Sequence, residues 1–259
     1  EALEVPATND EISRLTISFN KMLARLDEAF TAQKQFSANA AHELRTPLAV
    51  IQTNLEVFAR RETPALKDYQ EIFAMLQEQT GRLSHLAEIL LDMTGVQTVE
   101  RSERISLAAL TDEVFCDLAS VAEQKEVELI QQEGDCIITG SYLLLYRAVY
   151  NLVENAIKYN HSGGKVTVNI HPSEEITDTS TSVNYVFLEV SDTGIGIPPE
   201  YQEKIFTPFF RVDKSRSRAM GGAGLGLALV SEIVRQHNGQ VKVLESSKKG
   251  SVIAIMLPV

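Results

Sequence analysis

The sequence contains only two cysteines and no long apolar run, and each of these two shortages excludes a class of protein. Cys116 and Cys136 are too few and too far apart for a metal cluster or a redox motif, so we expect them to be reduced core cysteines. No stretch approaches the roughly 18 apolar residues that a membrane-spanning helix needs. No signal-peptide pattern opens the chain, which begins mid-pattern at Glu1, and we therefore expect a piece of a longer protein.

Positive charge is also scarce, because the sequence has 24 Lys and Arg but 35 Asp and Glu, which gives a net charge of −11. Nucleic-acid binding depends on pairing with phosphate charges, so no nucleic-acid partner is expected. At 259 residues the chain is long enough for two modest domains, each with its own core.

Residues 1 to about 97 have the periodicity of helices. In the first segment, apolar residues recur three and four apart, as in a coiled coil, at Ile12, Leu15, Phe19, Met22 and Leu26. This stripe continues as far as Phe58, and a polar break at 60–64 precedes a second amphipathic helix that Pro64 can begin. Two long helices joined by a short turn form a hairpin. One hairpin offers its apolar stripes too little partner surface, so the pattern predicts a homodimer with a four-helix bundle.

Polar residues 98–104 read as a hinge between domains, and from about residue 105 strand-like and helix-like segments alternate with glycine-rich turns. Strands are predicted at 127–131, 136–139, 165–171, 183–191, 240–245 and 251–257. Helices are predicted at 107–123, 141–159, about 199–205 and 224–238. The polar stretch 172–182 is predicted to be a solvated hairpin loop.

His42 is predicted to face away from the interior of the helical bundle, toward solvent. It lies two residues, or about 200°, from both Ala40 and Leu44 on the apolar stripe. Thr46 follows one turn later on the same outer face, and Glu43 is the next residue along the chain. An exposed imidazole can act as a nucleophile, with a carboxylate accepting its proton. A surface histidine on a charged helix is the alternative.

Four segments of the second half have the composition of a nucleotide site. The first places Asn151, Asn155, Lys158 and Tyr159 on one polar face of a helix. An asparagine carbonyl can bind Mg²⁺, a lysine can meet phosphate charge and a tyrosine ring can cover a base. Without further evidence, this face could be only the polar side of an amphipathic helix.

The second segment, Asp192-Thr193-Gly194-Ile195-Gly196, follows a predicted strand. It predicts a turn with close backbone approach and one fixed acceptor, suited to the exocyclic amine of adenine. It could equally be an ordinary turn at the end of a strand.

The third segment, 206–211, is apolar and ends at Arg211. It is followed by a local basic cluster, at Lys214, Arg216 and Arg218, in an acidic chain. Such a cluster suits phosphate binding, although exposed loops often carry similar charges.

The fourth segment, 221–229, is glycine-rich and leads directly into a predicted helix. Backbone amides at Gly222, Gly224 and Gly226 can face an anion at the amino end of that helix. A dinucleotide-binding Rossmann motif would follow the first strand of a parallel unit, whereas this segment lies near the C-terminus.

The segment His42-Glu43-Leu44-Arg45-Thr46-Pro47-Leu48 resembles the phosphoacceptor box of two-component sensor histidine kinases. The resemblance implies that His42 is phosphorylated, that Glu43 is the general base and that Thr46 positions water for dephosphorylation of the partner. Upstream, Asp10-Glu11-Ile12 and the residues 19–22 resemble the second helix of a signal-relay linker, although Ser13 replaces the usual glycine.

From about residue 105 to 259, the four segments in this order are similar to the ATP-binding domain of histidine kinases, Hsp90, type II topoisomerases and a DNA-mismatch repair family. The fold that this implies is an α/β sandwich, a mixed sheet with helices on one face. By resemblance, Asn155 coordinates Mg²⁺ and Asn151 lines the same face. Asp192 would bind the adenine amine, and Tyr159 the base.

By the same resemblance, Lys158 and Arg211 approach phosphate. Gly194 and Gly196 shape the adenine pocket, while Gly222, Gly224 and Gly226 frame the lid and the phosphates. The implied division of the chain is a linker helix at 1–30, a dimerisation and phosphotransfer domain at 31–97, a hinge at 98–104 and an ATP-binding domain at 105–259.

The resemblance implies a kinase that uses ATP and Mg²⁺ to phosphorylate His42 and then an aspartate of a response regulator, with phosphatase activity toward that regulator. It also implies the cytoplasmic part of a protein attached to the inner or plasma membrane through a missing N-terminal region. Two alternatives stay open: an ATPase of the same fold without phosphohistidine, and a dimerising scaffold that only senses the nucleotide.

Overall fold

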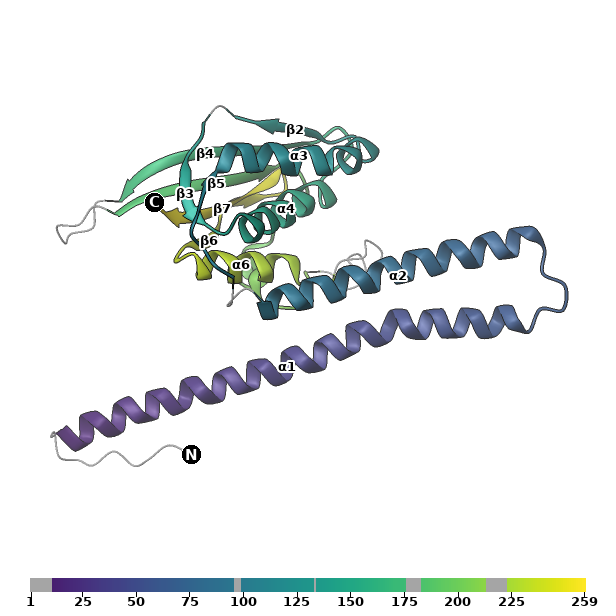
Figure 1. Ribbon diagram of the computed structural model, residues 1–259, viewed down its shortest axis with the longest axis horizontal. Coiled ribbons are helices and arrows are strands. Elements are labelled where there is room, and N and C mark those ends of the chain that lie inside the picture. Colours follow the sequence, from purple (N-terminus) through teal and green to yellow (C-terminus); the bar gives the residue numbers. More distant parts are fainter. Residues whose placement is uncertain (1–10, 96–98, 133, 176–182, 213–222) are drawn as a thin grey trace. The chain divides into compact units, whose positions relative to one another are not determined.

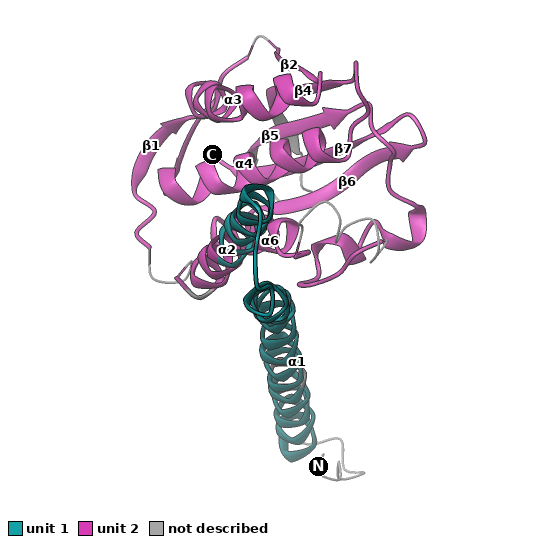
Figure 2. Ribbon diagram, turned by 90° about the vertical axis from the view of Figure 1, so that its right-hand side faces the viewer, with its two compact units in different colours: residues 1–83 teal, residues 84–259 magenta. Residues whose placement is uncertain are grey.

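The computed structural model describes residues 11–95, 99–132, 134–175, 183–212 and 223–259 (Figure 1). The chain divides into two compact units, residues 1–83 and 84–259, which are coloured separately in Figure 2. The division falls within the second helix, N-terminal to the predicted hinge. Among the described residues, no helix has both the length and the apolar character that crossing a membrane requires.

The first unit consists of α1, Glu11–Ala59, and the N-terminal part of α2, Leu66–Gly95, as the predicted helical hairpin requires. Asp68 organises the turn between them. Its carboxylate accepts the Ala65 N–H at 2.8 Å and pairs with Arg61, and these two contacts hold the pKa of Asp68 below its usual value. Next to them, the rings of Phe58 and Tyr69 meet edge to face at 5.0 Å.

Many apolar side chains of the two helices remain exposed to solvent. They include members of the predicted coiled-coil stripe and extend into α2: Ile12, Leu15, Phe19, Met22, Leu26, Phe30, Leu48, Leu55 and Phe73. A patch of this extent is unusual on a monomer and indicates a partner surface.

The second unit contains a five-stranded mixed sheet in the order β2-β4-β5-β7-β6, in which only the β2–β4 pair is parallel. A two-stranded sheet, β1-β3, is separate. The strands are β1 Glu103–Ser106, β2 Glu128–Gln131, β3 Ile137–Gly140, β4 Lys165–Glu175, β5 Val183–Asp192, β6 Gln240–Ser247 and β7 Gly250–Pro258. The helices are α3 Leu107–Gln124, α4 Tyr142–Lys158 and α6 Gly226–Gln236, with short 3₁₀ turns η1 Pro199–Tyr201 and η2 Lys204–Phe206.

Helices α3, α4 and α6 lie over the same face of the sheet (Figure 1). Alternation along the strands explains which side they cover, because every second residue of β4 and β5 is apolar and buried: Val166, Val168, Ile170, Val186, Leu188 and Val190. The fold class predicted from the sequence, a helical hairpin followed by a mixed-sheet α/β domain, is confirmed.

Three local predictions are wrong. The sequence does not predict β1, whose first two residues, Glu103 and Arg104, fall in the predicted hinge. These two residues are polar and exposed, and Ile105 is the one buried residue of the strand, so β1 has no run of alternating apolar residues that would mark it. Residues 172–175 continue β4 instead of forming a loop. Pro172 is tolerated there because β2 pairs with β4 only over 165–168, which leaves β4 an edge strand beyond that point. Residues 199–206 form the two 3₁₀ turns rather than an α-helix.

His237 joins the end of α6 to the start of α4. The imidazole is only 7% exposed, with Nδ1 2.8 Å from the Ile233 carbonyl oxygen and Nε2 3.1 Å from the Ser141 nitrogen. Since Ser141 donates its N–H, Nε2 accepts and the proton resides on Nδ1, so the ring is neutral. Burial lowers the pKa of His237, and Arg101 adds to this effect, whereas the Ile233 carbonyl opposes it.

A lowered pKa in the folded state makes stability depend on pH. Below pH 6.5 the unfolded chain binds a proton at this position that the folded chain does not. The contribution of His237 to the free energy of unfolding is therefore fully present above pH 6.5 and declines as the pH falls toward the lowered pKa. The slope has an upper limit of about 1.4 kcal/mol per pH unit. Urea unfolding of wild type and His237→Gln between pH 5 and 8 should show a shallower pH dependence in the variant. His161→Gln, at an exposed histidine, should keep the wild-type slope, and equal slopes in all three proteins would contradict the assignment.

Candidate functional site

The polar face of α4 forms one wall of a pocket in the second unit. The Asn155 Nδ2 donates to the Asn151 carbonyl oxygen, and the Asn151 Nδ2 donates to the Arg147 carbonyl oxygen, both at 2.8 Å. Since the amide nitrogens are engaged by the helix backbone, the Oδ1 atoms are the groups that remain for a ligand. Lys158 and Tyr159 line the same pocket, and the Lys158 Nζ lies 6.0 Å from the centre of the Tyr159 ring.

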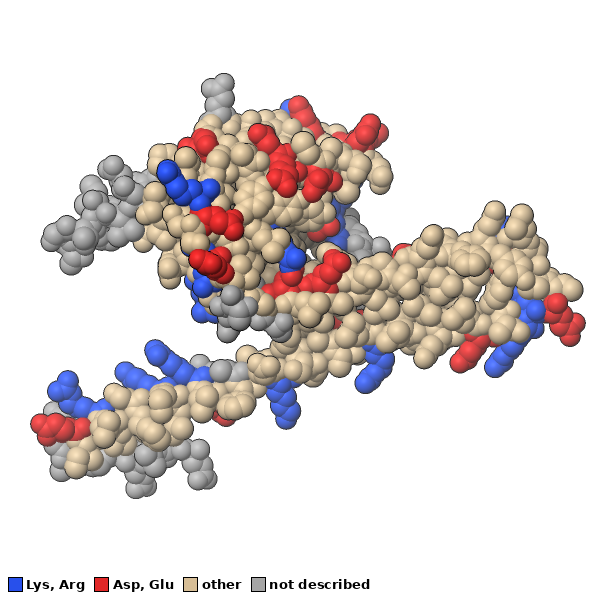
Figure 3. Space-filling view, in the orientation of Figure 1, with Lys and Arg blue, Asp and Glu red and all other residues tan. Residues whose placement is uncertain are grey.

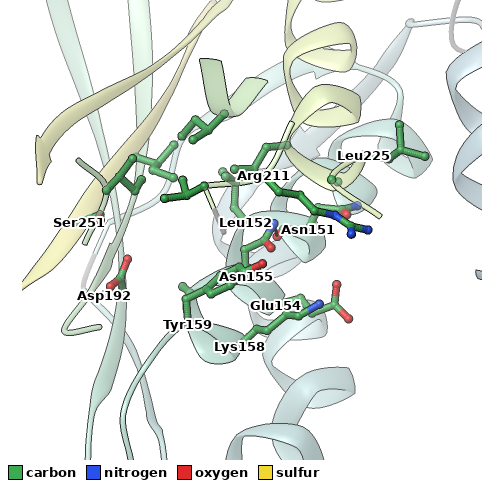
Figure 4. A pocket seen from close by; sticks show the side chains of 18 of the residues that line it. Asn151, Leu152, Glu154, Asn155, Lys158, Tyr159, Asp192, Arg211, Leu225 and Ser251 are labelled. Atoms are coloured by element: carbon green, nitrogen blue, oxygen red, sulfur yellow. Dashed lines mark hydrogen bonds between the residues drawn. The ribbon is translucent and has the colours of Figure 1, made fainter. Parts of the chain in front are cut away.

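Asp192 ends β5 and places a carboxylate at the other side of the pocket (Figure 4). Its Oδ1 accepts the Gly194 N–H at 2.7 Å, closing a tight turn of the kind that the sequence predicts. Burial raises the pKa of Asp192, while backbone N–H groups of Gly194 and Ser251 act in the opposite direction. The result is a partly desolvated acceptor in a fixed orientation.

The glycines of this turn are required by close backbone contacts. A Cβ on Gly194 would lie 2.4 Å from the Tyr159 carbonyl oxygen. Gly196 has a φ of +72°, and a Cβ there would lie 1.8 Å from the Ser247 carbonyl oxygen. The turn therefore packs directly on the end of α4 and on β6.

The segment from Phe209 to Arg211 is held against the glycine-rich segment. The Phe209 N–H donates to the Gly224 carbonyl oxygen at 2.8 Å, and both residues have positive φ, 64° and 73°. Gly226 begins α6, where a Cβ would lie 2.5 Å from the Asn151 Oδ1. The amino end of α6 thus abuts the asparagine pair, which suits the binding of an anion.

One pocket therefore collects the residues that the sequence singled out: Asn151, Asn155, Lys158, Tyr159, Asp192, Gly196, Arg211, Gly224 and Gly226. Gly194 supports it through Asp192. Gly222 and the basic residues Lys214, Arg216 and Arg218 lie outside the described residues. The rest of the wall is largely apolar, with Leu152, Ala156, Val190, Ile195, Ile197, Ile205, Phe210, Leu225 and Ile253. An apolar slot with one acceptor and a polar end matches a base joined to phosphates.

Several lining residues were not predicted. Ser251 and Ile253 belong to β7 and reach the pocket because β7 pairs with β5, and no local motif marks them. His85 and Ile89 come from the C-terminal part of α2, which belongs to the same unit as the pocket.

The asparagine pair also suits a magnesium ion. Mg²⁺ prefers hard oxygen ligands and is commonly held by one or two protein groups together with phosphates. The Asn155 Oδ1 is one such oxygen, in the pocket that the amino end of α6 also lines. Among the described residues there is no group of three or more His, Cys, Asp or Glu that would hold a metal without a nucleotide.

His42, Glu43 and Thr46 belong to α1 in the first unit and do not line the pocket. His42 is exposed, in agreement with the predicted outward orientation, and Glu43 and Thr46 are half-buried. The Thr46 hydroxyl donates to the His42 carbonyl oxygen at 3.2 Å. The helix continues through Pro47 without interruption.

Comparison with known proteins identifies both parts. Residues 32–98 match the His Kinase A (phospho-acceptor) domain, and residues 140–259 match the histidine kinase-, DNA gyrase B- and HSP90-like ATPase domain. Sensor histidine kinase RppB of Synechocystis is 35% identical over 238 residues, covering 90% of this chain and 50% of RppB. CusS of Escherichia coli K12 is 32% identical over 251 residues, covering 96% of this chain and 50% of CusS.

The fold has a counterpart in the crystal structure of histidine kinase ThkA in complex with the response regulator protein TrrA. The TM-score is 0.68 at 22% identity, and the alignment covers 96% of this chain and 68% of that one. The chain belongs to the two-component sensor histidine kinase family. It spans about half the length of the RppB and CusS sequences.

Gly196→Ala should lower both stability and nucleotide binding, because a side chain would be forced into the Ser247 carbonyl at positive φ. Gly163 provides a matched control, since its φ is +74° but a Cβ there meets nothing within 4 Å. Gly163→Ala should cost only about 1–2 kcal/mol of backbone strain, and Gly196→Ala more. Urea unfolding and ATP titration test this, and equal losses in the two variants would contradict it.

The raised pKa of Asp192 predicts an acid-sensitive nucleotide site. The carboxylate accepts a proton at a higher pH than an ordinary aspartate does. The affinity for ATP should therefore have its maximum value at neutral pH and fall as the pH decreases through that pKa. Asp192→Asn should bind ATP weakly and lose this step. Because the same nucleotide titrates in both experiments, the difference between the two affinity–pH curves isolates Asp192. Parallel curves would refute the prediction.

Proposed function

We propose that this chain is the catalytic core of a sensor histidine kinase, which transfers the γ-phosphoryl group of ATP to His42. The observation that carries the proposal is a single pocket uniting Asn155, Asp192 and Gly226, in a chain that also presents an exposed His42 within a phosphoacceptor segment. The functional division proposed is a linker at 1–30, a phosphotransfer domain at 31–97, a hinge at 98–104 and an ATP-binding domain at 105–259.

In this proposal, the apolar walls of the pocket take the adenine ring, with Tyr159 at its side. Asp192 accepts a hydrogen bond from the exocyclic amine. Lys158 and Arg211 approach the phosphates, and the amino end of α6 at Gly226 adds favourable potential. Mg²⁺ held by the Asn155 Oδ1 would supply charge neutralisation at the phosphates when bound.

Transfer requires a nucleophile outside the pocket, and the exposure of His42 allows the approach of a second domain. A ring nitrogen of His42 forms a bond to the γ-phosphorus while the bond from that phosphorus to the β–γ bridging oxygen breaks, and ADP leaves. Glu43, the neighbouring carboxylate, accepts the proton from the other ring nitrogen. His42 and the pocket belong to different units, and we propose that flexing at the predicted hinge, 98–104, carries the nucleotide site to His42.

The phosphoryl group is then expected to pass to an aspartate on a response regulator. ThkA, solved with the response regulator TrrA, provides the precedent. Thr46, whose hydroxyl lies one turn from His42, is proposed to position water for the reverse dephosphorylation. On the face of the second unit that Figure 3 shows, Asp and Glu cover more of the surface than Lys and Arg. Because such a surface repels phosphate charges, we propose no nucleic-acid partner.

A homodimer is proposed as the working form. The exposed apolar residues of α1 and α2, among them Leu15 at 70% and Phe73 at 62%, need a partner surface that a second hairpin supplies in a four-helix bundle. Attachment to a membrane is proposed for the full-length protein, through a region N-terminal to this chain.

Incubation with γ-labelled ATP and Mg²⁺ tests the proposal. Wild type should acquire an acid-labile, base-stable label, which His42→Gln should abolish while ATP binding remains. His171→Gln is the matched control, because His171 stacks on Phe187 in the sheet and does not line the pocket. Release of free phosphate without protein labelling would favour an ATPase instead, and binding without turnover would favour a nucleotide-sensing scaffold.

A further inference from the structure

Ser246 is half-buried and does not line the pocket, but it contacts two residues that do, Ile197 and Ser251. The Ile197 N–H donates to the Ser246 Oγ at 2.7 Å. The same Oγ lies 2.9 Å from the Ser251 Oγ. A register irregularity in β6 between Val243 and Glu245 brings Ser246 opposite Ser251 of β7. One hydroxyl therefore links the turn that follows Asp192 to β7, the strand that pairs with β5.

Ser251 lies beside the proposed adenine acceptor. It is the register partner of Asp192 in the β5–β7 pair, and both residues line the pocket (Figure 4). Its backbone N–H also interacts with the Asp192 carboxylate. A carboxylate and a hydroxyl thus stand next to each other at the same end of the pocket, where they can contact adjacent positions of one base edge.

The direction of the serine–serine hydrogen bond decides what Ser251 offers to a ligand. Each hydroxyl has one hydrogen. Ser246 already accepts the Ile197 N–H, and accepting a hydrogen bond makes a hydroxyl a better donor. If Ser246 donates to Ser251, the hydrogen of Ser251 remains available to a ligand in the pocket, which Ser251 lines. If Ser251 donates instead, only its lone pairs face the pocket.

We propose that Ser246 is a positioning residue that turns the Ser251 hydroxyl into a donor and thereby sets the base selectivity of the site. The inference rests on the proposed nucleotide function. Asp192 as acceptor beside Ser251 as donor complements a base with an amine next to a ring nitrogen lone pair, as in adenine. Hypoxanthine and guanine present an oxygen next to an N–H, which leaves both protein groups facing a group of the wrong kind.

Three triphosphates separate the contributions of the two groups. Purine riboside triphosphate has the ring nitrogen lone pair but no amine, and inosine triphosphate has an N–H and an oxygen at the same positions. The affinity ratio of purine riboside to inosine triphosphate contains a contribution from Asp192, which is the same in wild type and Ser246→Ala, and a contribution from Ser251. The change in this ratio therefore reports the state of Ser251, and the ratio should fall about fivefold in Ser246→Ala, as expected for one neutral hydrogen bond. The ratio of ATP to purine riboside triphosphate reports the amine contact with Asp192 and should not change.

The controls distinguish positioning from structural support. Ser247→Ala alters the adjacent exposed serine, whose Oγ accepts the Lys249 N–H at 3.1 Å, and should leave both ratios at their wild-type values. Ser246→Thr keeps the hydroxyl and should restore the first ratio. Ser251→Ala should reduce the first ratio without altering the second, which provides an independent test if Ser246→Ala folds poorly.

A parallel loss of both ratios in Ser246→Ala would show that Ser246 only supports the turn, and an unchanged first ratio would show that it does not orient Ser251. Either result would overturn the inference while ATP binding and labelling of His42 continued. If wild type bound no triphosphate, the proposed function itself would fail. The two failures are therefore distinguishable.

Discussion

The pocket depends on how closely three backbone segments approach one another around α4. The turn after Asp192 rests on the Tyr159 and Ser247 carbonyls, Gly224 lies against the Phe210 carbonyl, and Gly226 lies against the Asn151 side chain. Each contact is shorter than a side chain would allow, so glycine is a steric requirement at these positions. The close approach leaves an apolar slot between the turn and α4, with the amino end of α6 at the polar end of the slot.

The polar groups in the walls of this apolar slot are held in fixed orientations. Asp192 is desolvated, yet two backbone N–H groups orient it, and the cost of burial appears as a raised pKa. The asparagine amides satisfy their nitrogens on the backbone of α4, which leaves oxygens for a ligand. At the amino end of α4, neutral His237 joins Ser141 to the last turn of α6, so α6 contacts α4 at both of its own ends, through His237 and through Gly226.

In the proposed function, the segment around His42 on α1 has a different physical requirement from the pocket. His42 needs exposure rather than burial, and the helical period places it opposite the apolar stripe. The same stripe is incompletely covered within one chain. In the proposed function, assembly and phosphoryl transfer use opposite faces of α1, so that a second copy would cover one face while His42 stays exposed on the other.

Much of this was readable from local patterns. The helical hairpin and six of the seven strands that the structure describes follow from periodicity within short windows, because apolar alternation and glycine turns act locally. The clustering of Asn155, Asp192 and Gly226 was implied only by the resemblance to a known family, because these residues lie in separate segments of the chain. Strand β1 and the extension of β4 past Pro172 were missed, since polar residues and a proline hide strands that lie at edges. Tertiary structure alone decided that Ser251 lines the pocket next to Asp192 and that Ser246 contacts both Ile197 and Ser251. The Ile197–Ser246 contact joins residues 49 apart through strand pairing, and such pairing leaves no periodic trace in the chain.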